Sequence, residues 1–83
     1  MKVKYFAWVR ERIGVAEEEI VLPDEIDTAH ELILFLKDRG DGYAVAFERD
    51  AFIRVAADQQ HIQHETSIRG AREVALFPPM TGG

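Results

Sequence analysis

Residues 28–40 read TAHELILFLKDRG, and this stretch carries the strongest structural signal in the sequence. Thr28 followed three residues later by Glu31 is the pattern of a capping box, in which each residue satisfies a free backbone N–H of the other at a helix start. The apolar residues behind it recur at the spacing of one helix face: Ala29, Leu32, Ile33 and Leu36. We therefore expect an amphipathic helix of about twelve residues that begins after Thr28 and ends at Gly40.

The sequence on both sides of this helix alternates between two sets of residues, as strands do. The segments with this period are residues 3–9, 18–22, 53–57 and 73–77. We expect a strand in each of them, because their β-branched and aromatic residues suit a pleated sheet.

Two other segments are less regular. Residues 43–48 fit either a short helix or a strand, and we favour the helix. Residues 58–72 are polar and are expected to form a loop with a short edge strand around His61.

This order of elements predicts the α+β class, as a roll in which a mixed sheet of four to five strands packs on one main helix. With 83 residues, the chain is expected to form a single domain over residues 1–83. The residues expected to face the helix are Val3, Tyr5, Ala7, Ile20, Leu22, Ile53, Val55, Val74 and Leu76. Phe6, Trp8 and Phe77 then lie on the other face, as an exposed apolar patch unless a loop or residues 43–48 cover them.

Composition excludes several classes of function. Ten basic and fifteen acidic residues give a net charge of −5, which argues against nucleic acid and anionic membranes as partners. The absence of cysteine excludes disulfides, thiolate zinc sites and a cysteine nucleophile. No apolar run approaches the roughly 18 residues of a membrane helix, and the N-terminus lacks the pattern of a signal peptide.

Neither the histidines nor the acidic run predicts a metal site. His30, His61 and His64 lack a supporting pattern of carboxylates and are expected to be solvated. The run Glu17–Glu19 is expected to be a solvated charge run as well. The sequence therefore predicts no active site built from the chain's own side chains.

Residues 78–83, PPMTGG, come directly after the last expected strand and contain no charged side chain. Two prolines restrict the start of this segment, and two glycines make its end slender. We expect a flexible tail that, fully extended, reaches ~20 Å into a narrow channel and presents the carboxylate of Gly83. Such an end suits activation as an acyl-adenylate and transfer to a nucleophile, whereas a frayed polar terminus is the simpler alternative.

Two motifs resemble the small subunit of molybdopterin synthase. They are the opening Val3-Lys4-Tyr5-Phe6-Ala7-Trp8-Val9-Arg10-Glu11 and the closing Glu73-Val74-Ala75-Leu76-Phe77-Pro78-Pro79-Met80-Thr81-Gly82-Gly83. That family has the ubiquitin-like β-grasp fold, and the resemblance covers essentially the whole chain. The ending Phe-Pro-Pro-x-Thr/Ser-Gly-Gly is its most specific part.

The resemblance implies a mechanism. An ATP-dependent adenylating enzyme activates the Gly83 carboxylate, which becomes a thiocarboxylate, while Gly82 gives the slender approach. The tail then enters the large catalytic subunit and donates sulfur to cyclic pyranopterin monophosphate, in assemblies of two small and two large subunits. The resemblance also implies a cytoplasmic protein that itself binds no cofactor. The positions implied to bind partners are Phe6, Arg10, Phe77, Pro78, Pro79, Met80 and Thr81.

Two departures affect the expected interface. The loop near His61 is polar where the family often has an apolar contact residue, and residues 69–72 read RGAR in place of an acidic turn. The alternatives are a sulfur carrier of the thiamine pathway, which shares the fold and the Gly-Gly ending, and a ubiquitin-like modifier or interaction module.

Overall fold

The structure is a computed structural model and describes residues 1–79, so the predictions for Met80, Thr81, Gly82 and Gly83 lie outside the described residues. The elements, in chain order, are β1 (Lys2–Tyr5), α1 (Ala7–Ile13), β2 (Glu17–Glu19), α2 (Ala29–Lys37), α3 (Asp41–Ala46), the 3-10 helix η1 (Asp50–Phe52), β3 (Arg54–Ala57), β4 (Gln60–Ile62) and β5 (Glu73–Phe77).

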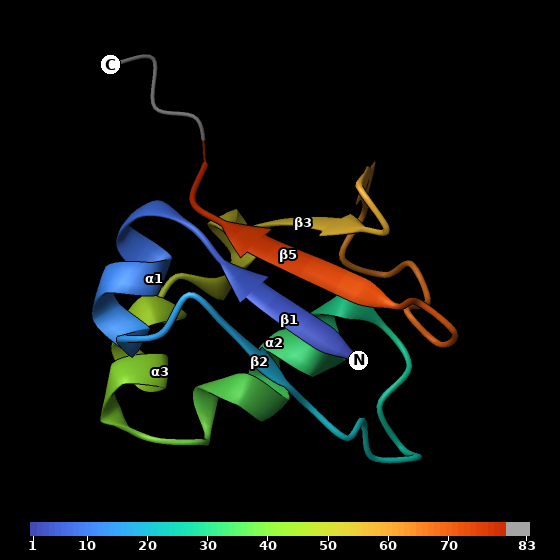
Figure 1. The fold of residues 1–83 in the computed structure, drawn as a ribbon, viewed down its shortest axis with the longest axis horizontal. Helices are drawn as coiled ribbons and strands as arrows, with labels where there is room; N and C mark the ends of the chain where they lie inside the picture. The colour runs from blue at the N-terminus through green and yellow to red at the C-terminus, as the bar shows by residue number, and fades with distance from the viewer. Residues whose placement is uncertain (80–83) are drawn as a thin grey trace.

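The sheet has five strands in the order β2-β1-β5-β3-β4. The central pair β1 and β5 is parallel, and every other pair is antiparallel. Helix α2 lies across one face of this mixed sheet, while α1 and α3 lie together near one end (Figure 1). The predicted α+β class and β-grasp arrangement are therefore confirmed.

Helix α2 forms as the sequence predicts at its start but ends earlier. Both bonds of the capping box are present, with Glu31 N–H donating to Thr28 Oγ1 at 3.1 Å and Thr28 N–H donating to Glu31 Oε1 at 3.0 Å. The helix ends at Lys37, so the prediction that it continues to Gly40 is wrong. The next N–H groups, those of Asp38 and Arg39, bond three residues back, which tightens the last turn and frees Gly40 to precede α3.

The predicted strand over residues 3–9 is wrong beyond Tyr5. The carbonyl of Phe6 accepts hydrogen bonds from the N–H groups of Val9 and Arg10, which starts α1. Ala7 is therefore exposed instead of facing α2. Trp8 lies on a helix and packs against the core, so its predicted place on the outer sheet face is also wrong.

The predicted strand over residues 18–22 is shorter and begins one residue earlier, as β2. Strand β2 ends at Glu19 because its partner β1 begins at Lys2. The last hydrogen bond between the two segments is donated by Ile20 N–H to the Met1 carbonyl at 2.8 Å. Ile20 is still buried and Leu22 half-buried, while Val21 is exposed. The short helix predicted over residues 43–48 is present as α3, but it begins and ends two residues earlier, at Asp41 and Ala46. The strands predicted over residues 53–57, around His61 and over residues 73–77 are confirmed as β3, β4 and β5, with β3 beginning at Arg54.

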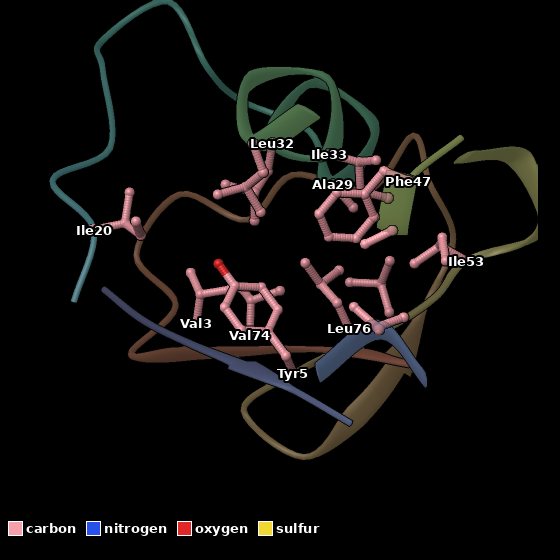
Figure 2. Packing of buried hydrophobic residues seen from close by; sticks show 14 of the residues in the cluster. Val3, Tyr5, Ile20, Ala29, Leu32, Ile33, Phe47, Ile53, Val74 and Leu76 are labelled. Carbon is pink, nitrogen blue, oxygen red and sulfur yellow. The ribbon is translucent and has the colours of Figure 1, made fainter. Parts of the chain in front are cut away.

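The core lies between α2 and the sheet (Figure 2). All four residues of the predicted helix stripe are fully buried: Ala29, Leu32, Ile33 and Leu36. Alternate residues of the central strands meet them, including Val3, Tyr5, Val74 and Leu76. Because successive side chains of a strand point to opposite faces, Phe77, which follows the inward-facing Leu76, lies on the open face of the sheet.

The contact between α1 and α3 depends on Gly42, because a Cβ there would lie 2.6 Å from the Arg12 carbonyl oxygen. We expect Gly42→Ala to lower the free energy of unfolding by about 1–3 kcal/mol, since the two helix backbones must separate. Gly40→Ala is the matched control, because its Cβ would meet only the Tyr43 ring at 3.7 Å. Urea titrations of both variants measure the free energy of unfolding. Equal decreases in the two variants would show that the close approach of Gly42 to the Arg12 carbonyl does not contribute to stability.

Candidate partner-binding surface at the base of the tail

The surface begins where the two central strands end. Because β1 and β5 are parallel and Tyr5 is paired with Leu76, Phe6 and Phe77 come next at the same end of the sheet. Phe6 N–H donates to Leu76 O at 3.1 Å, and the two phenyl rings meet edge to face with centroids 6.5 Å apart. Phe6 is 42% exposed and Phe77 is half-buried, which places an accessible aromatic pair directly before Pro78.

His61 completes this group, which we call the aromatic surface: Phe6, His61 and Phe77. The His61 and Phe77 rings are nearly perpendicular, with their centroids 5.4 Å apart. Sequence reasoning expected a short edge strand around His61 but a solvated imidazole, and so it missed this contact with Phe77. Strand register was the signal that could have found it, since Ala56 pairs with both His61 and Ala75 and so puts His61 on the open face.

The other predicted site residues lie around this surface. Arg10 is exposed in the last turn of α1, and within residues 1–79 it forms no ion pair. Pro78 and Pro79 are half-buried and continue from β5. The structure therefore brings the rings of Phe6 and Phe77 together, while Arg10 is joined to Phe6 through its backbone N–H, which donates to the Phe6 carbonyl at 3.3 Å.

Two of the three histidines, His30 and His64, are less solvated than the sequence suggests, whereas His61 is exposed as predicted. His64 is half-buried, and its Nε2 lies 2.6 Å from the Ile53 carbonyl oxygen, so that nitrogen carries the proton and donates. His30 is half-buried too, with its ring centroid 6.0 Å from that of His64. In the part of the chain that the structure describes, no three His, Asp or Glu side chains gather as a metal site.

Glu18 contradicts the prediction of a solvated charge run. One carboxylate oxygen accepts hydrogen bonds from the hydroxyls of Tyr5 at 2.7 Å and Tyr43 at 2.6 Å, and the other accepts from Arg39 at 3.1 Å. Burial alone would raise the pKa of Glu18, but the two tyrosine hydrogen bonds and the Arg39 charge hold this pKa below its ordinary value. Burial and the Glu18 hydrogen bond raise the pKa of Tyr5 far above its usual range.

This cluster is structural in character, because every member is satisfied by another and no described buried side-chain N or O lacks a partner. It joins β1, β2 and the α2–α3 segment. Perturbed titratable groups often mark active sites, but these donors and acceptors are already used by one another.

We expect Glu18→Gln to lower the free energy of unfolding by about 1–3 kcal/mol at neutral pH. The neutral amide cannot replace the carboxylate charge that strengthens the hydrogen bonds from both tyrosines and Arg39. The pKa of Glu18 is lower in the folded chain, so its stabilisation is present above its ordinary pKa of 4.5 and is lost as the pH falls below it. Urea titrations across pH should show the difference between variant and native chain shrinking below pH 4.5.

The matched control is Glu17→Gln on the same strand, whose ion pair with Lys2 is half exposed and should contribute less than about 1 kcal/mol. Equal effects of the two variants, or no dependence on pH, would contradict the role of the cluster.

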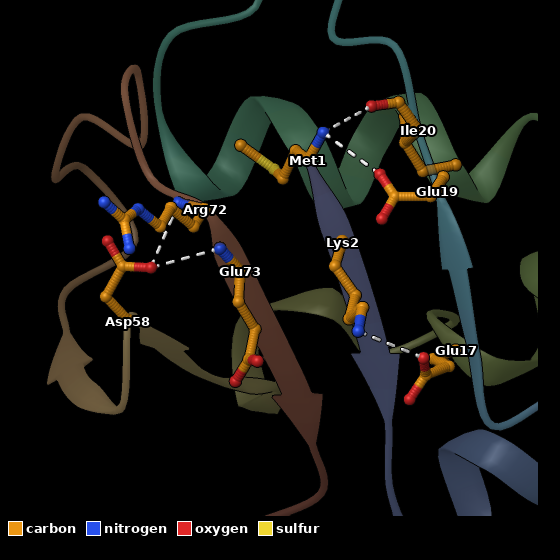
Figure 3. A network of polar contacts seen from close by, with 8 residues as sticks. All are labelled: Met1, Lys2, Glu17, Glu19, Ile20, Asp58, Arg72 and Glu73. Atoms are coloured by element: carbon orange, nitrogen blue, oxygen red, sulfur yellow. Dashed lines mark hydrogen bonds and ion pairs between the residues drawn. The ribbon is translucent and has the colours of Figure 1, made fainter.

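At the other end of the sheet, polar contacts hold the strands in place (Figure 3). The Met1 amino group donates to the Ile20 carbonyl at 3.1 Å, which ties the chain start to the residue after β2. The turn between β3 and β4 is fixed by Asp58, whose carboxylate accepts from the N–H groups of Arg72 and Glu73 at 3.0 and 3.1 Å. The Asp58 contacts fix the start of β5 against the turn after β3, at the end of the sheet opposite Phe77.

A model of the ThiS family matches residues 3–83, from the second residue of β1 to the Gly-Gly end. The chain belongs to the ThiS family. The molybdopterin synthase sulfur carrier subunits of Haemophilus influenzae and Escherichia coli are 37% and 32% identical to it over 83 residues, covering all of this chain and 99% of each relative.

Solved structures agree with this ThiS-family assignment. A Pyrococcus furiosus protein named for molybdopterin converting factor, subunit 1, is 31% identical and superposes with a TM-score of 0.72 over 95% of each chain. The similarity therefore extends over the β-grasp fold as a whole. Within residues 1–79, no helix of this ThiS-family chain has the length and apolar character needed to cross a bilayer.

Proposed function

We propose that this chain is the sulfur-carrier subunit of a molybdopterin synthase, acting through a thiocarboxylate at Gly83. The observation that carries the proposal is full-length similarity to carriers of that name, at 37% and 32% identity. The aromatic surface supports it, because accessible aromatic side chains at the base of a tail suit a partner that receives the tail. The chain itself would bind no cofactor.

The proposed chemistry uses the terminal carboxylate instead of a side chain. In the adenylating enzyme, a Gly83 carboxylate oxygen attacks the α-phosphorus of ATP, and pyrophosphate leaves. Hydrosulfide or an equivalent sulfur nucleophile then attacks the carbonyl carbon, AMP leaves with its bond to that oxygen intact, and a thiocarboxylate remains. A slender Gly82–Gly83 end leaves the carbonyl open to attack, because no Cβ shields it.

Sulfur transfer would take place on the large subunit. The tail, residues 78–83, would enter that subunit's pocket, with Pro78 and Pro79 limiting the conformations of its start and Met80 and Thr81 contacting the pocket wall. Phe6 and Phe77 would dock on the subunit surface, and Arg10 would meet an acidic group. The thiocarboxylate sulfur would attack a carbon of cyclic pyranopterin monophosphate and displace an oxygen substituent, which forms a thioester between Gly83 and the pterin. Water would then hydrolyse this thioester, returning Gly83 to a carboxylate and leaving the sulfur on the pterin. The transfer would take place in a cytoplasmic complex of two small and two large subunits.

Reconstitution tests this proposal. The chain bearing a Gly83 thiocarboxylate is mixed with a purified large subunit and cyclic pyranopterin monophosphate, and product dithiolene is measured. We expect product in proportion to thiocarboxylate, and none from the carboxylate form.

The alternatives give other outcomes. Sulfur transfer to a thiazole synthase, with none to the pterin, would identify a carrier of the thiamine pathway. Stable isopeptide adducts between Gly83 and target lysines would identify a modifier.

A further inference from the structure

A second surface lies beside the tail, separate from the aromatic surface. It is a hollow of about 600 Å³ whose lining includes Trp8, Arg12, Val45, Arg49, Phe52 and Pro79. These residues come from α1, α3, the segment around η1 and the start of the tail. Val45 and Phe52 are 50% and 61% exposed, so large apolar side chains stand open to solvent here.

The hollow also carries positive charge that the described chain leaves unpaired. The Arg12 guanidinium lies 4.3 Å from the centroid of the Trp8 ring, which holds it at the hollow. Within residues 1–79, neither Arg12 nor Arg49 forms an ion pair, whereas Arg39 is paired with Glu18 and Arg69 with Asp24. Glu48 is the one carboxylate among the described lining side chains, so the local balance is positive in a chain of net charge −5.

Pro79 connects this hollow to the aromatic surface. It lines the hollow and lies two residues after Phe77, so a protein that encloses the tail passes both surfaces. Charged residues at a rim steer and orient a partner, while exposed apolar side chains add buried area. The hollow thus offers two features to one partner segment: an apolar wall and two arginines.

We propose that an acidic and apolar segment of the large synthase subunit occupies this hollow, so that the subunit holds the carrier on both sides of the tail. The inference rests on the proposed function. A carboxylate of the subunit pairs with Arg12 and Arg49, and a neighbouring apolar side chain packs on Val45 and Phe52.

Calorimetric titration of the full-length chain with the purified large subunit tests this. Arg12→Glu and Arg49→Glu are each expected to raise Kd by about tenfold or more, because each turns an attraction into a repulsion. Arg72→Glu is the matched control: it makes the same charge change at the other end of β5 and should alter Kd by less than about twofold. Phe52→Ala should raise Kd by about fivefold with little change in melting temperature, since its side chain is 61% exposed.

Native affinity in both arginine variants and in Phe52→Ala would overturn the inference while leaving the proposed function intact. No binding by the native chain would remove the proposed function, and this inference with it. Sedimentation that shows a native dimer converted to monomer by Arg49→Glu would assign the hollow to a second copy and overturn the inference.

The remaining alternative is that the chain's own terminal carboxylate occupies the hollow. Trp8 is the single tryptophan, so fluorotryptophan at this position reports on the hollow by fluorine NMR. Without the large subunit, the fluorine resonance should be the same whether the full-length chain ends in its natural carboxylate or in an amide. It should shift when the large subunit is added. A shift caused by the amide as large as that caused by the subunit would assign the hollow to the tail and overturn the inference.

Discussion

One alanine added after Gly83 is expected to reduce sulfur transfer by about a thousandfold or more while leaving the fold intact. The extra residue moves the terminal carboxylate by ~3.5 Å, which takes it away from the position at which it attacks ATP in the adenylating enzyme. It also places a methyl group beside the carbonyl that sulfur must reach. Product dithiolene formed from ATP, a sulfur source and the large subunit measures the effect.

The control for this prediction keeps the length of the tail. Met80→Leu conserves volume and apolar character and should leave sulfur transfer within about threefold of native. Urea titration of the extended chain should give the native free energy of unfolding. If mass spectrometry shows that the extended chain is untrimmed and it still transfers sulfur at the native rate, the carrier mechanism is contradicted.

Phe77→Ala is expected to weaken binding of the large subunit about a hundredfold, a loss of ~2.7 kcal/mol that is typical of an aromatic side chain central to an interface. Its cost to folding should be smaller, about 1–2 kcal/mol, because Phe77 is only half-buried and its neighbours Phe6 and His61 can close on the space. Calorimetric titration gives Kd, and urea titration gives the free energy of unfolding.

Leu34→Ala is the matched control, since Leu34 is 41% exposed on α2, which lies on the opposite face of the sheet. It should leave Kd unchanged. A loss of stability in Phe77→Ala with native affinity would show that Phe77 serves the core and not the partner.

The parts of this fold that sequence predicted correctly are those in which local signals agree. In α2, the capping box and the apolar stripe point to the same helix, and β5 combines strict alternation with Pro78 as a stop. The segment 3–9 failed because two periods overlap there. Val9 and Ile13 share the helix spacing of i and i+4, while Val3 to Val9 also alternates.

The missed contacts are long-range ones. Glu18 meets Tyr5, Arg39 and Tyr43, which are 13, 21 and 25 residues away along the chain. No local pattern marks such a carboxylate as different from its exposed neighbours. Two of the three residues of the aromatic surface, Phe6 and Phe77, were predicted by parity to lie on the face of the sheet away from the helix. His61 requires the register of β3 against β4 and β5.

The topology explains why the tail starts where it does. The parallel β1–β5 pair brings Phe6 and Phe77 to one end of the sheet. Helix α1 begins at Ala7 and places Trp8 and Arg12 in the hollow that Pro79 also lines. The hollow and the aromatic surface thus flank one segment, Pro78–Pro79. A partner that binds either surface is already positioned to receive the tail.

Because the chain contains no cysteine, a thiol-reactive probe can report sulfur on Gly83 without a competing side-chain thiol. The untagged chain is incubated with ATP, the host's adenylating enzyme and a sulfide source, then treated with a thiol-reactive probe and fragmented for mass spectrometry. We expect one label, at Gly83, and none when ATP is omitted. No label at Gly83, with an adenylating enzyme shown to be competent on a known carrier, would mean that this chain does not carry sulfur as a thiocarboxylate.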